Sequence, residues 1–265
     1  MKRRQFLGGG LALAAGLGGI GTIGYAVAQV SNMNDAINKS GRQRMLSQRL
    51  AKGYLQVGQG IDADRSKRIV DLSLNLFEKQ LTELKAFAPS QENRATLDEA
   101  GRIWTSYREA LTARTPNAQD AKAVLTLNEE VLALAHAATV QLEKLSASGI
   151  GRLVNISGRQ RMLSQRMAKF YQALNWGVAS PDAAAKLAQA RKEFVAALAE
   201  LAAAPSNTPQ INGEIALVQQ QWVFFDNALN ATNTDKAKLA LNVATTSERI
   251  LETMDGITGM YEKLS

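Results

Sequence analysis

One ten-residue sequence, SGRQRMLSQR, occurs twice in this chain, at positions 40–49 and again at positions 157–166, 117 residues further on. Scattered matches continue at about the same offset, and both halves close with the sequence EKLS. Such self-similarity indicates that one folding unit has been duplicated. We therefore divide the chain into a leader, residues 1–28, and two copies of one module, residues 29–147 and 148–265.

Each copy has the composition and the periodicity of α-helices. Ala, Leu, Glu, Lys and Gln are abundant, and apolar residues recur at steps of three and four, as in Leu74, Phe77, Leu81 and Leu84. Breaks rich in Gly, Pro, Ser, Thr and Asn divide each copy into four segments. The predicted fold is all-α, with two tandem antiparallel four-helix bundles related by a pseudo-two-fold axis. At 146–151 the bundles are joined either by a break or by a nearly unbroken helix.

The leader has the features of an export signal. Lys2, Arg3 and Arg4 precede a Gly/Ala/Leu-rich stretch that ends in the small-x-small pattern Ala26-Val27-Ala28. The paired arginines resemble a twin-arginine signal, which predicts a periplasmic protein. An ordinary secretory signal and an uncleaved N-terminal membrane anchor are the alternatives. No later stretch approaches the ~18 uninterrupted apolar residues of a membrane span, so we expect the remainder to be soluble.

Composition excludes several classes of function. Without cysteine there are no disulfides, thiolate nucleophiles or thiolate metal sites. The single histidine, His136, follows Ala133 where a Glu-x-x-His di-iron pair needs glutamate, so we interpret it as a helix-face histidine. The leader carries three of the net +7 charges, which leaves a mild +4 and disfavours nucleic acid as a partner. We expect no enzyme activity, metal or cofactor.

The chemistry of the repeated motif is carried by arginine. On a helical wheel one broad face holds Ile37, Gly41, Arg44, Met45 and Gln48. Glycine inside a helix costs ~1 kcal/mol against alanine, so Gly41, and Gly158 in copy two, suggest a close approach by a backbone or a ligand. A buried guanidinium needs an acceptor, and its planar fork suits nitrate, nitrite or a carboxylate. We therefore predict that Arg44 and Arg161 converge on one small anion.

The other motif residues are expected to play supporting roles. Arg49 and Arg166 lie about 140° round the helix from the central arginines, which favours pairing between helices. Met45 and Met162 are expected in the core. Ser47 and Ser164 either donate to the anion or bond back to the helix backbone. The structural alternative is that all of these arginines form salt bridges to neighbouring helices or lie in solvent.

The segment INKSGRQRMLSQRLAK resembles the signature of the N-terminal sensor domain of type IV pilus chemotaxis transducers (PilJ-type). It is also similar to the P-box of nitrate/nitrite sensor kinases (NarX-type). The resemblance implies that the arginines preceding the motif methionines, Arg44 and Arg161, hold the ligand between first helices. The resemblance also implies that Lys39, two residues before the motif glycine, belongs to the ligand-binding site. In copy two Ile156 replaces this lysine, so we expect an asymmetric site.

The resemblance also implies a partner. Such sensors are followed by signalling domains, whereas this sequence stops after its last predicted helix, so we expect it to report to a membrane sensor kinase or chemoreceptor. The arginine pair forms either within one chain or across a homodimer. A structural adaptor that binds no small ligand is the alternative function.

Overall fold

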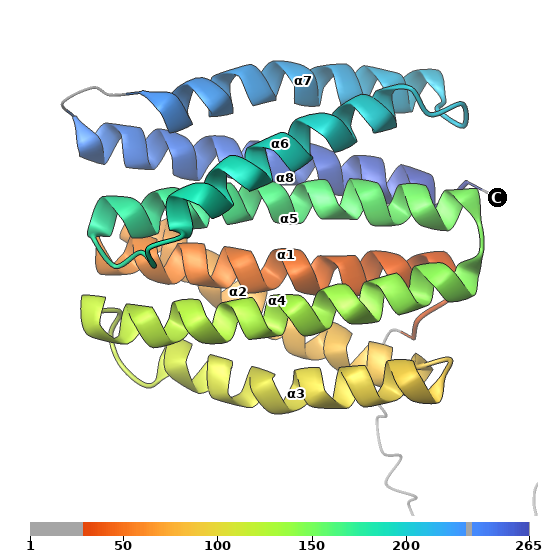
Figure 1. Ribbon diagram of the computed structural model, residues 1–265, viewed down its shortest axis with the longest axis horizontal. Coiled ribbons are helices and arrows are strands. Elements are labelled where there is room, and N and C mark those ends of the chain that lie inside the picture. Colours follow the sequence, from red (N-terminus) through yellow and green to blue (C-terminus); the bar gives the residue numbers. More distant parts are fainter. Residues whose placement is uncertain (1–28, 232–234, 265) are drawn as a thin grey trace, which may run out of the picture.

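The computed structural model describes residues 29–231 and 235–264, which form eight α-helices (Figure 1). The first copy contains α1 (Met33–Gly58), α2 (Ala63–Phe87), α3 (Gln91–Thr112) and α4 (Ala118–Ser146). The second copy contains α5 (Gly149–Trp176), α6 (Ala183–Ala202), α7 (Pro209–Asn230) and α8 (Lys236–Glu262). The predicted all-α fold with tandem helical bundles is confirmed. The predicted leader, residues 1–28, lies outside the described residues.

Local sequence fixes where most of the helices begin. Six of them start after a side chain that accepts a hydrogen bond from the backbone three residues on, namely Asn32, Ser90, Asn117, Ser148, Thr208 and Asp235. These caps satisfy N–H groups that have no partner inside the helix. Pro209 opens α7, where its missing N–H removes no helical hydrogen bond.

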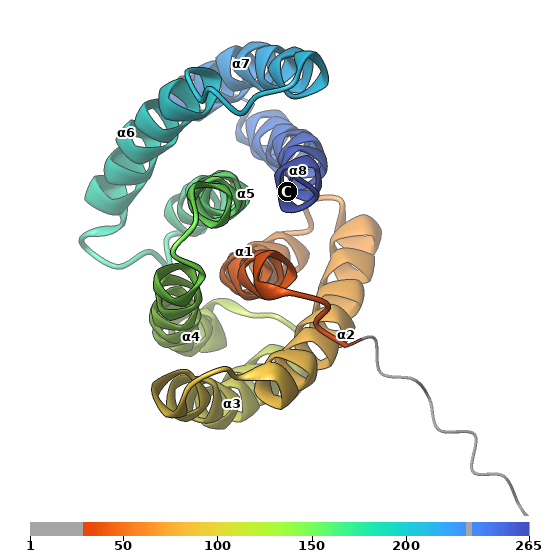
Figure 2. The ribbon, with the colours of Figure 1, turned by 90° about the vertical axis from the view of Figure 1, so that its right-hand side faces the viewer.

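The two helices that carry the repeated motif lie side by side at the centre of the molecule. Figure 2 shows α1 and α5 in the middle, α4 and α8 beside them, and the pairs α2/α3 and α6/α7 on opposite outer sides. Both central helices run in the same direction (Figure 1). This arrangement is that of a two-fold pair of bundles built within one chain.

The central position of α1 buries it on every side. The consecutive residues Gln43, Arg44, Met45 and Leu46 are between 0% and 4% exposed. Four consecutive residues span most of the circumference of a helix. The prediction of a single buried face on this helix was therefore too narrow, because the helix is buried around most of its circumference. The reason is tertiary, because α1 packs against α5 in addition to its own bundle.

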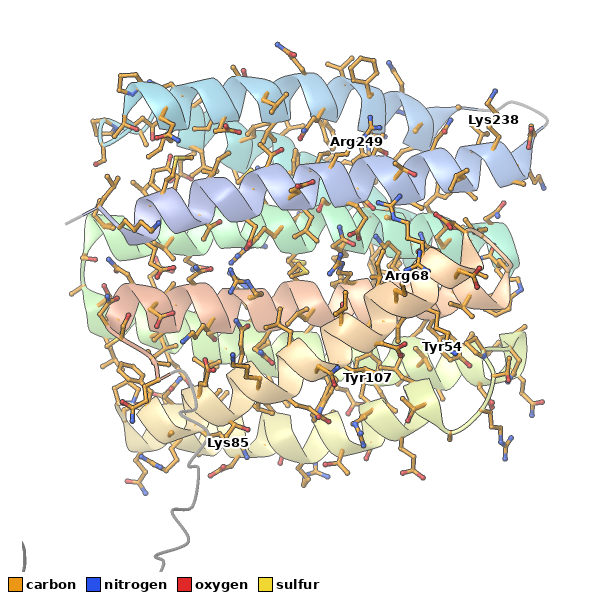
Figure 3. All side chains as sticks on the ribbon, turned by 180° about the vertical axis from the view of Figure 1, so that it is seen from behind. Tyr54, Arg68, Lys85, Tyr107, Lys238 and Arg249 are labelled. Atoms are coloured by element: carbon orange, nitrogen blue, oxygen red, sulfur yellow. The ribbon has the colours of Figure 1, made fainter. Side chains whose placement is uncertain are left out.

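Each copy repeats the same aromatic packing in its outer layer. Phe77 of α2 stacks on Trp104 of α3 with ring centroids 3.8 Å apart, and Phe194 stacks on Trp222 at 4.7 Å. Tyr107 reaches from α3 to the central layer, where its hydroxyl donates to the carbonyl of Ser47 at 2.9 Å (Figure 3). The outer helices thereby hold α1 in a defined position.

The bundles are joined by a sharp reversal and not by a continuous helix. Helix α4 ends at Ser146, Ala147 adopts a left-handed conformation with φ of 47°, and Ser148 caps α5. The chain then runs back in the opposite direction (Figure 1). This reversal brings the two motif helices together in parallel.

Helix α4 is long and apolar enough to cross a membrane by length and composition, with a mean hydropathy of 1.2 over its best 18 residues. A core helix of a bundle has the same composition. Its residues Val124, Val131, Ala138 and Leu142 are fully buried, and it packs on α1 and α3. We therefore interpret α4 as part of the bundle.

Candidate anion-binding site

Arg44 and Arg161 meet at the interface between α1 and α5. Both side chains are 0% exposed. A Cβ atom at Gly41 would lie 3.1 Å from Nη2 of Arg44 and 3.6 Å from Nη2 of Arg161. At Gly158 the corresponding distances are 3.1 Å to Arg161 and 3.7 Å to Arg44. The two glycines therefore leave the space that the two guanidinium groups occupy.

Each arginine reaches across the interface to an asparagine of the other copy. Nη2 of Arg44 donates to Oδ1 of Asn155 at 2.7 Å and to its carbonyl oxygen at 3.2 Å. Nη2 of Arg161 donates to the same atoms of Asn38, at 2.8 and 3.2 Å. The two asparagines are related by the repeat offset of 117. The interface therefore has pseudo-two-fold symmetry at the level of single hydrogen bonds.

These asparagines were not singled out from the sequence. Both stand three residues before the motif glycine, so aligning the copies beyond the decapeptide reveals them. Each amide group donates in turn to a glutamate, Asn38 to Glu262 and Asn155 to Glu143. The glutamates fix the orientation of the amides, which present their oxygen atoms to the arginines.

The symmetry breaks at the second nitrogen of each guanidinium. Nη1 of Arg161 donates to the carboxylate of Asp255 on α8. Nη1 of Arg44 instead faces Nδ1 of His136 on α4, at 3.4 Å. His136 and Asp255 occupy equivalent places, because the closing EKLS sequences are offset by 119 residues. One arginine thus has a carboxylate partner and the other an imidazole.

This difference affects the electrostatics of the pair. Burial lowers the pKa of Arg44 to about 9, and the charges of Arg159 and Arg161 act in the same direction. Burial also lowers the pKa of Arg161, to about 10, but there the carboxylate of Asp255 opposes it. Nε of each arginine is buried without a hydrogen-bond partner among the described residues. The pair is cationic at neutral pH and incompletely satisfied.

The other predicted residues contact the helix backbone, acidic side chains or the core, and no contact among the described residues joins Lys39 to the arginine pair. Ser47 and Ser164 donate back to the carbonyl oxygens of Arg44 and Arg161, at 2.8 and 2.9 Å. Lys39 contacts Glu83 at 2.9 Å and Asp35 at 3.2 Å. The Glu83 side chain is 1% exposed and needs a cationic partner, which accounts for the direction of this lysine. Met45 and Met162 are buried at 4% and 6% exposure.

One protein family matches this chain twice, over residues 25–138 and 145–247. Its description is the N-terminal domain of type IV pili methyl-accepting chemotaxis transducers, PilJ. The chain belongs to the PilJ family. The two matches correspond to the two copies and confirm the resemblance to PilJ-type domains. Neither curated proteins nor solved structures gave a match. The PilJ family is sensory and non-catalytic, so the chain is a sensory domain of the chemotaxis-transducer type.

In this PilJ chain the last arginine of each motif, Arg49 or Arg166, links the two copies through an ion pair. Arg49 and Lys52 of α1 contact Glu248 of α8, both at 2.5 Å. Arg166 and Lys169 of α5 contact Glu129 of α4, at 2.8 and 2.5 Å. Both lysine side chains are 0% exposed. The lysines belong to the sequence repeat, but their burial follows only from the packing of one copy on the other.

These ion pairs predict acid sensitivity. Burial alone raises the pKa of Glu248, but Lys52 and Arg49 outweigh it and lower the pKa to about 2, from 4.5. The stabilisation is present above pH 4.5 and is lost as the pH falls toward 2. We expect Glu248 to account for a loss of ~3 kcal/mol in unfolding free energy over that window. Urea unfolding at pH 7, 4.5 and 2.5 measures it, and the Glu248→Gln variant should show a shallower decline.

Proposed function

We propose that this PilJ chain is an exported sensory protein that binds one small anion at the Arg44–Arg161 pair and reports to a membrane partner. One observation carries the proposal. Two wholly buried arginines from the two copies converge between two glycines, and the buried Nε of each has no partner in the described part of the chain. A purely structural interface has no need to concentrate two cations in this way, because replacing buried charges with apolar side chains is often neutral or stabilising.

The chemistry of the pair favours a small planar anion. A guanidinium fork donates two parallel hydrogen bonds to two oxygen atoms in one plane, as nitrate, nitrite and carboxylates offer. Each charge-assisted hydrogen bond contributes ~1.5–3 kcal/mol, so three or four of them allow micromolar binding, ~8 kcal/mol, after the cost of association. The resemblance to nitrate and nitrite sensors makes these two anions the first to test.

Signal transmission follows from the location of the pair. The arginines lie between α1 and α5, so an anion that neutralises them favours one relative position of the copies over others. The partner is a membrane chemoreceptor or sensor kinase. The predicted leader would export this chain across the membrane, to the side on which it meets that partner. An anion shifts the equilibrium between two relative positions of the copies only if it binds one of them more tightly than the other.

The proposal is tested by thermal unfolding of the full chain with nitrate, nitrite, sulfate and small carboxylates at millimolar concentration. We expect at least one planar anion to raise the Tm by about 5 °C at roughly 100 times its Kd. Arg44→Lys and Arg161→Lys, which keep the charge but lose the fork, should each abolish the nitrate or nitrite shift. If no anion raises the Tm, the proposal is wrong.

One observation favours a second function, a ligand-free adaptor. Arg161 already has protein acceptors in Asn38 and Asp255, so this half of the pair is compatible with a purely structural role. An adaptor would bind its receptor equally well after Arg44→Lys and Arg161→Lys. Loss of receptor binding in these variants, together with an anion-dependent interaction, would rule it out.

A further inference from the structure

Two pockets flank the arginine pair at places related by the repeat. The Asp255 pocket, about 370 Å³, is lined by Arg42, Met45, Arg49, Glu248, Leu251 and Asp255. The His136 pocket, about 300 Å³, is lined by their counterparts Arg159, Met162, Arg166, Glu129, Leu132 and His136. The counterparts follow from the offsets of 117 in the motif helices and 119 in α4 and α8. The protein thus contains two versions of one pocket.

In the Asp255 pocket the protein supplies its own anion. The Asp255 carboxylate accepts from Nη1 of the buried Arg161 and, at 2.9 Å, from Nη2 of Arg42. Arg65 and Glu252 also line this pocket, so its lining holds three arginines and three acidic side chains, whose charges balance. This pocket therefore shows how a carboxylate bridges the buried middle motif arginine of one copy, Arg161, and the first motif arginine of the other copy, Arg42.

The His136 pocket contains the repeat counterparts of these two arginines, Arg44 and Arg159, without that carboxylate. Nη1 of Arg44 faces the His136 ring, and Arg44 is itself part of the pocket lining. Four basic side chains line this pocket against two acidic ones. One of the acids, Glu193, pairs with Arg159 at 2.6 Å. Arg166 pairs with Glu129, and Lys186 pairs with Asp182. The basic side chain left without a carboxylate partner among the described residues is Arg44, which is fully buried and whose Nε also has no partner there.

We infer that the His136 pocket binds a free small carboxylate in the place that Asp255 fills in the other pocket. Its oxygen atoms would accept from Arg44 and Arg159 beside the His136 ring. Leu132, Met162 and Ala190 of the lining would contact its hydrocarbon part. A volume of about 300 Å³ accommodates a small monocarboxylate, of which acetate and propionate are the simplest probes.

The two pockets also explain why one chain would hold one such ligand. A carboxylate entering the Asp255 pocket would meet the fixed Asp255 carboxylate and be repelled, whereas His136 is exposed and offers no negative charge. This site shares Arg44 with the proposed nitrate or nitrite site. It does not depend on that site, because Arg161 plays no part in it.

Thermal unfolding and calorimetry of the full chain test this inference, with acetate and propionate as ligands. We expect one carboxylate bound per chain and a Tm rise of about 5 °C at roughly 100 times the Kd. His136→Asp places a carboxylate where Asp255 lies in the other pocket. It should abolish both binding and the shift while raising the Tm of the ligand-free protein.

The matched control is Glu252→Ala in the Asp255 pocket, at the position equivalent to Ala133, and it should leave the acetate shift unchanged. An acetate shift that survives His136→Asp, or two acetates bound per chain, would overturn the inference. A nitrate shift that depends on Arg161, with no acetate response, would leave the proposed function standing and remove this site. No response to any anion would overturn both.

Discussion

Glu248→Ala is expected to lower the free energy of unfolding by about 3–5 kcal/mol. Glu248 is the carboxylate partner of Lys52, whose side chain is 0% exposed, and of Arg49. The substitution leaves the ammonium group of Lys52 buried between α1 and α8, where water cannot solvate it. Because these helices belong to different copies, the change also loosens the contact between the copies. Urea unfolding of the variant and the parent measures the difference.

Glu99→Ala provides the matched control for this prediction. Glu99 pairs with Arg102 at 2.5 Å, but their side chains are 45% and 68% exposed. An exposed pair contributes little to stability, because water solvates both charges when the pair is broken. If Glu248→Ala costs no more than Glu99→Ala, the ion pairs between the copies are not what holds the copies together.

Arg161→Met is expected to destabilise the protein by about 2 kcal/mol more than Arg44→Met. Methionine keeps the unbranched shape in both cases, and both variants lose the hydrogen bonds to an asparagine of the other copy. Only Arg161 also loses a carboxylate partner, Asp255. Removing Arg44 instead relieves repulsion from Arg159 and Arg161, the charges that help to lower its pKa.

Both variants are compared by urea unfolding at low salt and pH 7 without added anions. Equal losses, or a larger loss for Arg44→Met, would contradict the asymmetry between His136 and Asp255. The same variants separate stability from binding. Arg44→Met should remove every anion response, although it is the less destabilised protein.

Much of the architecture could be predicted from the repeat. Ten identical residues at an offset of 117, with four helical segments in each copy, were sufficient for tandem bundles. We predicted that Arg44 lies close to Arg161, because in each copy the middle motif arginine shares a helix face with the motif glycine three residues before it. Both inferences use local spacing or internal symmetry, which a single sequence contains.

The rest depends on which helices become neighbours. Helical periodicity predicts one apolar face and cannot reveal a helix such as α1, whose polar residues are buried on all sides by a second copy. The partner of Arg161 is 94 residues away and that of Arg49 is 199 residues away. His136 appeared as an ordinary helix-face histidine, because its equivalence to Asp255 requires the different offset at the ends of the copies. Lys39 points to Glu83, a carboxylate on a neighbouring helix.

The most direct test of the account is a crystal structure of the full chain soaked with the anion that gives the largest Tm shift. We predict one anion within hydrogen-bond distance of Arg44 inside a single chain, at the junction of α1 and α5 or in the adjoining His136 pocket. An anion bound elsewhere, with the Arg44 and Arg161 side chains unchanged, would contradict the central claim that the buried arginines form the sensory site.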